Sequence, residues 1–111
     1  MHPLTAKDLV HHRKLFSETD VDIAGVFKIL SDVNRYRIFL LLTKSSRVSI
    51  GSIAKILDIS VPLASQHLRM LVHAKLVQKE RDGKKVFPRL ERRNPLVQIV
   101  ILAIQRRGKA P

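Results

Sequence analysis

Apolar residues recur at helical spacing along most of the chain, and short polar stretches separate the repeats. A first pattern covers about residues 5–17. A second begins after Asp20, which we expect to cap a helix, and its apolar positions fall at i, i+3, i+4 and i+7 from Ile23 to Leu30. A third spans residues 34–44 and contains five consecutive apolar residues, which we expect to lie in the core. The first part of the chain is therefore predicted to form short helices.

Two further helices are predicted close together in residues 49–74. Ser49 is suited to cap the first helix, and residues 58–60 form a tight turn into the second. Ser60 is a good N-cap for this second helix, and Pro62 suits its first turn, where no N–H is needed. Two helices joined by three or four residues have the geometry of a helix-turn-helix.

The second helix of this pair has one apolar and one polar face. Its inward residues are predicted to be Val61, Ala64, Leu68 and Leu71. Its outward residues are predicted to be Pro62, Ser65, Gln66, Arg69 and His73. Most of the outward side chains can form hydrogen bonds, which is typical of a binding surface.

A short β-hairpin is predicted directly after the helix-turn-helix, in residues 76–90. The pair Asp82-Gly83 accepts positive φ and is a strong hairpin signal. Arg81, Lys84 and Lys85 lie at the predicted tip. A basic hairpin in this position is a wing, placed to touch backbone phosphates or the minor groove beside a bound helix.

The last helical pattern, residues 95–107, is apolar on nearly all sides. Gln98 is the one polar residue in 96–104, so this helix needs more cover than a small domain provides. We expect a second copy of the chain to cover it. The predicted contact residues are Leu96, Ile99, Val100, Ile101, Ala103 and Ile104.

Taken together, these patterns predict a mainly α fold with a small β-hairpin wing: a winged helix-turn-helix that dimerises through its terminal helices. The 111 residues are enough for one modest core, so a single domain is expected. Its predicted parts are an N-terminal helical extension (1–19), the helix-turn-helix (49–74), the wing (76–90) and the dimerisation helix (95–107).

The charge of the chain points to a polyanionic partner. The formal net charge is +12 and the pI about 11.0. The excess lies mainly in the second half, because residues 59–111 carry twelve Lys or Arg and three Asp or Glu. The chain has no cysteine, no secretory signal pattern and no apolar run long enough for a membrane span, so we expect a cytoplasmic protein without thiol chemistry.

Several short motifs occur in a characteristic order between Phe27 and Leu90. They are FKILSD (27–32), RYRI (35–38), Ile53-Ala54, SQHL (65–68) with Leu71, Leu76-Val77 and DGKKVF (82–87). In order and spacing this stretch, over half of the chain, resembles the ArsR/SmtB family of prokaryotic repressors.

The resemblance implies which residues contact double-stranded DNA. Ser65 and Gln66, with Val61 and Pro62 at the helix start, are expected to face the major groove, while the wing contacts the flanking backbone. Family members often carry Gln-Ser where this chain has Val61-Pro62, so contact with a thymine methyl is a possible substitute at that edge. The full predicted DNA-binding set is Val61, Pro62, Ser65, Gln66, His67, Arg69, Arg81, Lys84 and Lys85.

The positions of the family's metal ligands carry other residues in this chain. The expected cysteine pair falls on Ser49 and Gly51. The ligands of the C-terminal-helix site align approximately with Arg92, Asn94, Gln105 and Gly108. Asp8, His11 and His12 share a predicted helix face, for which a solvated charged surface is the ordinary interpretation. We therefore predict no metal and no cofactor.

The predicted function is that of a sequence-specific DNA-binding transcriptional regulator, a homodimeric repressor of ArsR type. A non-specific nucleic-acid-binding protein, architectural or RNA-binding, would use the same charge and is the alternative. No glycine-rich phosphate loop or catalytic constellation is present, so an enzyme is not expected. A membrane-surface role is disfavoured because the most apolar helix lacks a basic face. No sequence feature identifies a small-molecule effector.

Overall fold

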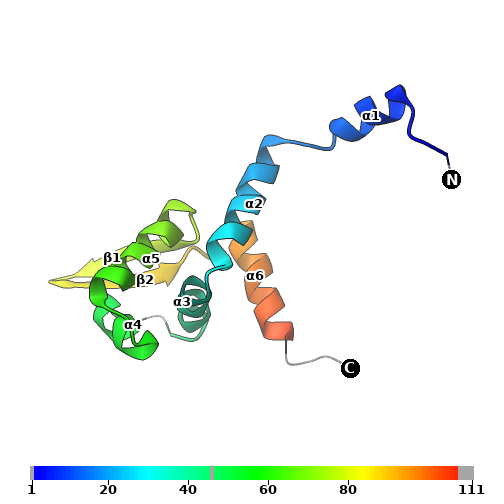
Figure 1. Ribbon diagram of the computed structural model, residues 1–111. Coiled ribbons are helices and arrows are strands. Elements are labelled where there is room, and N and C mark those ends of the chain that lie inside the picture. The colour runs from blue at the N-terminus through cyan, green and yellow to red at the C-terminus, as the bar shows by residue number, and fades with distance from the viewer. Residues whose placement is uncertain (1, 46, 108–111) are drawn as a thin grey trace.

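The computed structural model describes residues 2–45 and 47–107. Figure 1 shows its helices and its single antiparallel hairpin in chain order. The elements are α1 (Ala6–Arg13), α2 (Glu18–Leu30), α3 (Val33–Lys44), α4 (Ile50–Leu57), α5 (Val61–His73), β1 (Val77–Asp82), β2 (Lys85–Leu90) and α6 (Pro95–Arg106). None of these helices is long and apolar enough to cross a membrane.

Side-chain caps set the start of each helix around the helix-turn-helix. Asp32 accepts hydrogen bonds from the backbone N–H groups of Asn34 and Arg35 and begins α3. Ser49 accepts from Ser52 N and begins α4, and the Ser60 hydroxyl accepts from the backbone N–H three residues later, at the start of α5. The predicted starts of α4 and α5 are confirmed.

Both N-terminal helices differ from their predicted bounds. α2 begins three residues earlier than expected because Ser17 is its N-cap and the Asp20 carboxylate, at position N3, accepts from Ser17 N at 2.7 Å. Asp20 is therefore part of a capping box and not the cap itself. α1 ends at Arg13, so the predicted pattern over residues 5–17 overestimates its length.

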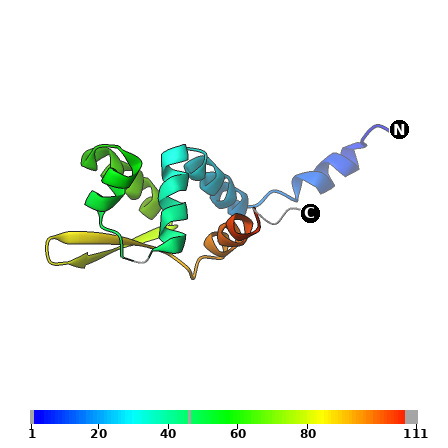
Figure 2. The same ribbon diagram turned by 90° about the horizontal axis from the view of Figure 1, so that it is seen from below.

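One hydrophobic core joins α3, α5, the base of the wing and α6. Ile38 and Phe39 on α3 are fully buried, as the consecutive apolar residues predicted, and Leu42 is nearly so. Leu68 on α5 and Val97 on α6 pack into the same cluster. Helix α3 therefore lies between the helix-turn-helix and the terminal helix, as Figures 1 and 2 show.

The wing is a regular two-stranded hairpin with a buried base and an exposed tip. Its register pairs Val77 with Leu90 at the base and Asp82 with Lys85 at the tip. Gly83, with φ of 62°, is followed by Lys84 in the two-residue loop. Positive φ at the first loop position only is the pattern of a type II′ turn, which glycine favours. The predicted hairpin is confirmed, with Asp82 in the last strand pair.

The terminal helices form the other end of the molecule. Helices α2 and α6 lie at this end, and α1 projects away from them (Figures 1 and 2). No residue of α1 is buried. On α6, Ile104 is buried in the core of its own protomer, although the sequence placed it at a dimer contact. Ile99, a predicted contact, is exposed. Leu102 is also exposed, although it was not among the predicted contacts.

Candidate nucleic-acid interface

The outward face of α5 carries unpartnered polar groups. Pro62, Gln66 and Arg69 are exposed and Ser65 is half-buried. Within the described part of the chain, the side chains of Gln66 and Arg69 have no hydrogen-bond or ion-pair partner. Val61, which was predicted to face inward, is 50% exposed at the first turn and adds an apolar group to the edge of this face. The exposed first turns of α5 therefore present both hydrogen-bonding and apolar groups.

His67 does not belong to this exposed face, contrary to the sequence prediction. It is 8% exposed, and its Nδ1 lies 3.5 Å from Arg35 Nη1 of α3. The buried positions of α5 are Ala64, His67, Leu68 and Leu71, which follow the i, i+3, i+4, i+7 series of an amphipathic helix. The histidine completes the inner face and is not available to a bound duplex.

Arg35 connects α3 to α5. Its Nε donates to the carbonyl oxygen of Ile29 at 2.7 Å, and its Nη1 lies 3.3 Å from the Met70 sulfur. Asp32 lies close by, with its Oδ2 4.0 Å from Arg35 Nη1. The backbone N–H of Arg35, and that of Asn34, lower the pKa of the Asp32 carboxyl below its ordinary value, although partial burial opposes this shift. The contacts of Arg35 therefore help to set the position of α5 relative to α3.

The tip of the wing is basic and open to solvent. Arg81, Lys84 and Lys85 are all exposed, and none of the three has a side-chain partner among residues 2–45 and 47–107. The wing also makes two ion pairs. Arg89 Nη1 lies 3.1 Å from Glu80 Oε2 across the two strands, and Arg47, from the segment before α4, pairs with Asp82. No local pattern in the sequence indicated the second pair, because its partners are 35 positions apart.

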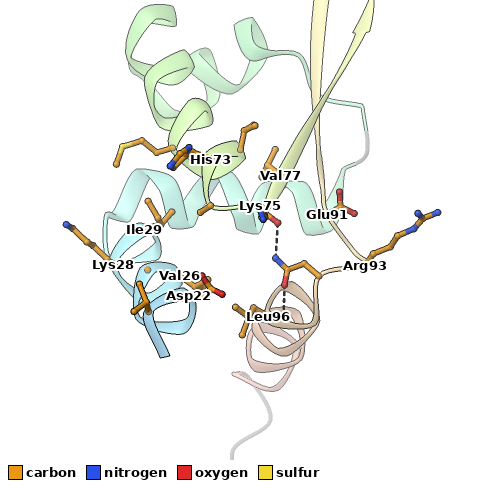
Figure 3. A pocket seen from close by; sticks show the side chains of 16 residues that line it. Asp22, Val26, Lys28, Ile29, His73, Lys75, Val77, Glu91, Arg93 and Leu96 are labelled. Atoms are coloured by element: carbon orange, nitrogen blue, oxygen red, sulfur yellow. Dashed lines mark hydrogen bonds between the residues drawn. The ribbon is translucent and has the colours of Figure 1, made fainter. Parts of the chain in front are cut away.

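A cavity of about 840 Å³ lies where the end of α5 meets α2 and the start of α6 (Figure 3). At the edge of this cavity, Asn94 connects the residues that follow α5 to the first turn of α6. Its Nδ2 donates to the carbonyl oxygen of Lys75 at 2.9 Å, and its Oδ1 accepts from Leu96 N at 3.0 Å. Lys75 has φ of 63°, which non-glycine residues rarely adopt. Asn94 therefore links the bend after α5 directly to the first turn of α6.

The positions that the resemblance aligns with metal ligands have structural or solvent-facing roles here. Ser49 caps α4, Asn94 caps α6, and Arg92 and Gln105 are exposed, while Gly108 lies outside the described residues. In α1, the Asp8 carboxylate accepts from Thr5 N, and His12 Nδ1 lies 2.6 Å from the Asp8 carbonyl oxygen. Among the described residues, no group of three or more His, Asp or Glu side chains is arranged to hold a metal ion.

The helix pair α4–α5 followed directly by the β1–β2 hairpin defines a winged helix-turn-helix protein. Residues 30–80 match a family described as a helix-turn-helix domain. The cadmium resistance transcriptional regulatory protein CadC of Listeria innocua is 38% identical over 74 residues, which cover 67% of this chain and 62% of that protein. A CadC homologue of Staphylococcus aureus is 32% identical over 87 residues, covering 77% of this chain and 72% of the relative. The chain belongs to the ArsR/SmtB family of winged helix-turn-helix transcriptional regulators.

A solved structure shows the same fold over almost the whole chain. It is the homodimeric winged helix-turn-helix DNA-binding domain Mb0332 of Mycobacterium bovis, described as a possible ArsR-family transcriptional regulator. The TM-score is 0.66 at 22% identity, and the match covers 95% of this chain and 87% of that domain. The predicted fold is therefore confirmed. Proteins of this family regulate transcription and are not generally enzymes.

Proposed function

We propose that this chain is a transcriptional repressor that binds a specific duplex DNA operator as a homodimer. The observation that carries the proposal is that one end of the molecule carries two exposed surfaces, the polar outer face of α5 and the basic tip of the wing (Figure 1). Neither surface uses its hydrogen-bonding or charged groups elsewhere in the described chain. Unpaired donors and cations on one side of a helix-turn-helix are suited to base edges and phosphates.

The two surfaces are suited to different parts of the DNA. A glutamine amide can donate to and accept from an adenine edge, so Gln66 is the first candidate for reading sequence, with Ser65 and Arg69 beside it. The ammonium groups of Lys84 and Lys85 reach phosphates, which are alike at every sequence. Arg81 adds a third cation to the wing. We therefore assign sequence reading to α5 and charge-based holding to the wing.

Exposed apolar residues at the terminal end support the homodimer. Ile99 and Leu102 on α6 and Val21 and Phe27 on α2 are all exposed in the single chain. A second copy would remove these residues from water, at a gain of roughly 25 cal/mol per Å² of apolar surface. The homodimeric state of the Mycobacterium bovis domain supports the same arrangement. A two-fold dimer would present two α5 helices to half-sites about one helical turn apart.

A competition experiment separates this proposal from the non-specific alternative. DNA fragments recovered with the protein from cells would identify an operator, and labelled operator would then compete against random duplex. A repressor should prefer its operator by roughly a thousandfold or more at physiological salt. A ratio close to one would favour an architectural or RNA-binding protein and would contradict the proposal.

A further inference from the structure

One arginine connects the wing to the rest of the molecule at two points. Arg47 lies in the segment between α3 and α4 and donates from Nη2 to the Asp82 carboxylate near the wing tip. Its guanidinium carbon also lies 4.1 Å from the centre of the Phe87 ring. Asp82 and Phe87 lie on the same face of the hairpin, because the strand partner of Phe87 is Glu80, two residues before Asp82 on β1. Arg47 therefore contacts two neighbouring side chains, Asp82 and Phe87, on one face of the wing.

The wing needs such a contact because little else holds its outer half. A two-stranded hairpin is at best marginally stable in water unless it packs on something. The wing is buried at Val77 on β1 and at Phe87, Pro88 and Leu90 on β2, whereas every residue from Gln78 to Lys85 is exposed. Without a contact near Asp82, the basic tip would be fixed only by the stiffness of its two strands. Its distance from the recognition helix would then vary.

We propose that Arg47 is a positioning residue for DNA binding, which braces the wing against the segment before α4. This inference rests on the proposed function, in which α5 and the wing contact one duplex together. With the brace in place, Lys84 and Lys85 are held at a fixed distance from α5, so phosphate contacts cost less conformational entropy on binding. The guanidinium stacks on an aromatic ring and bonds a carboxylate at once, which suits arginine better than lysine.

The wing supplies a matched control in its second ion pair. Arg89 and Glu80 are about as exposed as Arg47 and Asp82, with side-chain exposures of 52% and 49% against 57% and 65%. Removal of either arginine deletes one positive charge and one exposed ion pair. The Arg89 pair, however, joins the two wing strands to each other and not to the segment before α4. Only the loss of Arg47 should remove the contact between the wing and the segment before α4.

The test is a double-mutant cycle on operator affinity, between Arg47→Ala and the wing variant Lys84→Ala with Lys85→Ala. If Arg47 positions Lys84 and Lys85, replacing both lysines should lower operator affinity less in the Arg47→Ala background than in the wild-type protein. We expect their effect to shrink by about threefold to tenfold, which is the range for one exposed ion pair with a cation–π contact. Arg89→Ala should leave the effect of the lysines unchanged. Arg47→Lys should restore part of the coupling.

A second measurement needs no DNA. In the free protein, backbone ¹⁵N order parameters in the wing should fall in Arg47→Ala and stay near wild type in Arg89→Ala, with α3 and α5 unchanged in both. Unchanged wing order together with additive affinities would overturn the inference. An additive loss of affinity accompanied by a salt slope smaller by about 0.9 would make Arg47 a direct phosphate ligand and would also overturn it. If the lysine variant itself bound DNA like wild type, the proposed function of the wing would fail, whereas the order parameters would still test the brace.

Discussion

The two ends of this molecule leave different kinds of group without a partner. At the end formed by α4, α5 and the wing, the uncovered groups are mainly hydrogen-bonding and cationic, with Gln66, Arg69, Lys84 and Lys85 among them. The end formed by α1, α2 and α6 carries most of the exposed large apolar side chains of the described residues, and Phe27, Ile99 and Leu102 are each more than half exposed. Polar groups can remain in water at no cost, whereas contiguous apolar surface cannot.

We infer from this difference that the two ends have partners of different chemistry, as the proposed function requires. In the proposed function, the basic end binds DNA through groups that are already exposed in the free chain. The apolar end gains stability only when another apolar surface covers it, and the projecting helix α1 shows how little cover it finds in its own protomer (Figure 2). Dimer formation and DNA binding should therefore respond to separate sets of substitutions.

The largest expected effect is the loss of the dimer in Ile99→Glu. A carboxylate at this position would lie in the apolar contact, which should raise the dimer dissociation constant about a thousandfold, or about 4 kcal/mol. Sedimentation velocity measures the change. Ile56→Glu on α4 is the matched control, because Ile56 and Ile99 are both 60% exposed. The control should stay dimeric. A stable dimer in Ile99→Glu would place the contact elsewhere.

Two leucine truncations should separate the ends by their effects on stability. Leu68 is fully buried on α5, so Leu68→Ala should lower the free energy of unfolding by about 2–5 kcal/mol and leave dimer affinity almost unchanged. Leu102 is exposed on α6, so Leu102→Ala should weaken the dimer and cost the protomer little. Urea unfolding and sedimentation give both quantities. Similar effects of the two substitutions on both readouts would argue against two separate ends.

The smallest expected effect concerns acid stability at the cap of α3. The pKa of Asp32 is lowered from its ordinary value of 3.8, mainly by the backbone N–H of Arg35. A lowered pKa contributes stability that is present above 3.8 and is lost as the pH falls through the folded value. Asp32→Asn keeps the cap but cannot titrate, so its melting temperature should fall less steeply below about pH 4. Parallel melting curves for the variant and wild type would show that Asp32 contributes nothing there.

Local signals were enough to predict the helix-turn-helix and the wing. Ser49 and Ser60 cap their helices through contacts three residues away, and Gly83 allows the hairpin turn by its own backbone freedom. Such signals need no knowledge of distant segments. The same reasoning misplaced the start of α2, because an aspartate can serve either as the cap or at the third position of a capping box.

Features that depend on distant contacts could not be predicted in this way. His67 was included in the predicted DNA-binding set, whereas in the structure it is buried and lies beside Arg35 of α3. The spacing of Ala64, His67, Leu68 and Leu71 was the one local clue. On α6, all-round apolarity predicted a contact but not which side faces the protomer core, and this is decided by where α3 lies. Ile104 was misassigned for that reason.

We propose that α5 reads sequence while the wing holds phosphates. Fluorescence anisotropy tests it directly, with operator and scrambled duplexes at several salt concentrations and two variants, Gln66→Ala and Lys84→Ala with Lys85→Ala. Gln66→Ala should cost roughly 1–3 kcal/mol on the operator and little on scrambled DNA. The lysine variant should weaken both duplexes alike and reduce the salt slope by about 0.9 for each phosphate that the wing no longer neutralises. If Gln66→Ala weakened both duplexes equally while the lysine variant bound only the operator more weakly, the assigned roles of α5 and the wing would be contradicted.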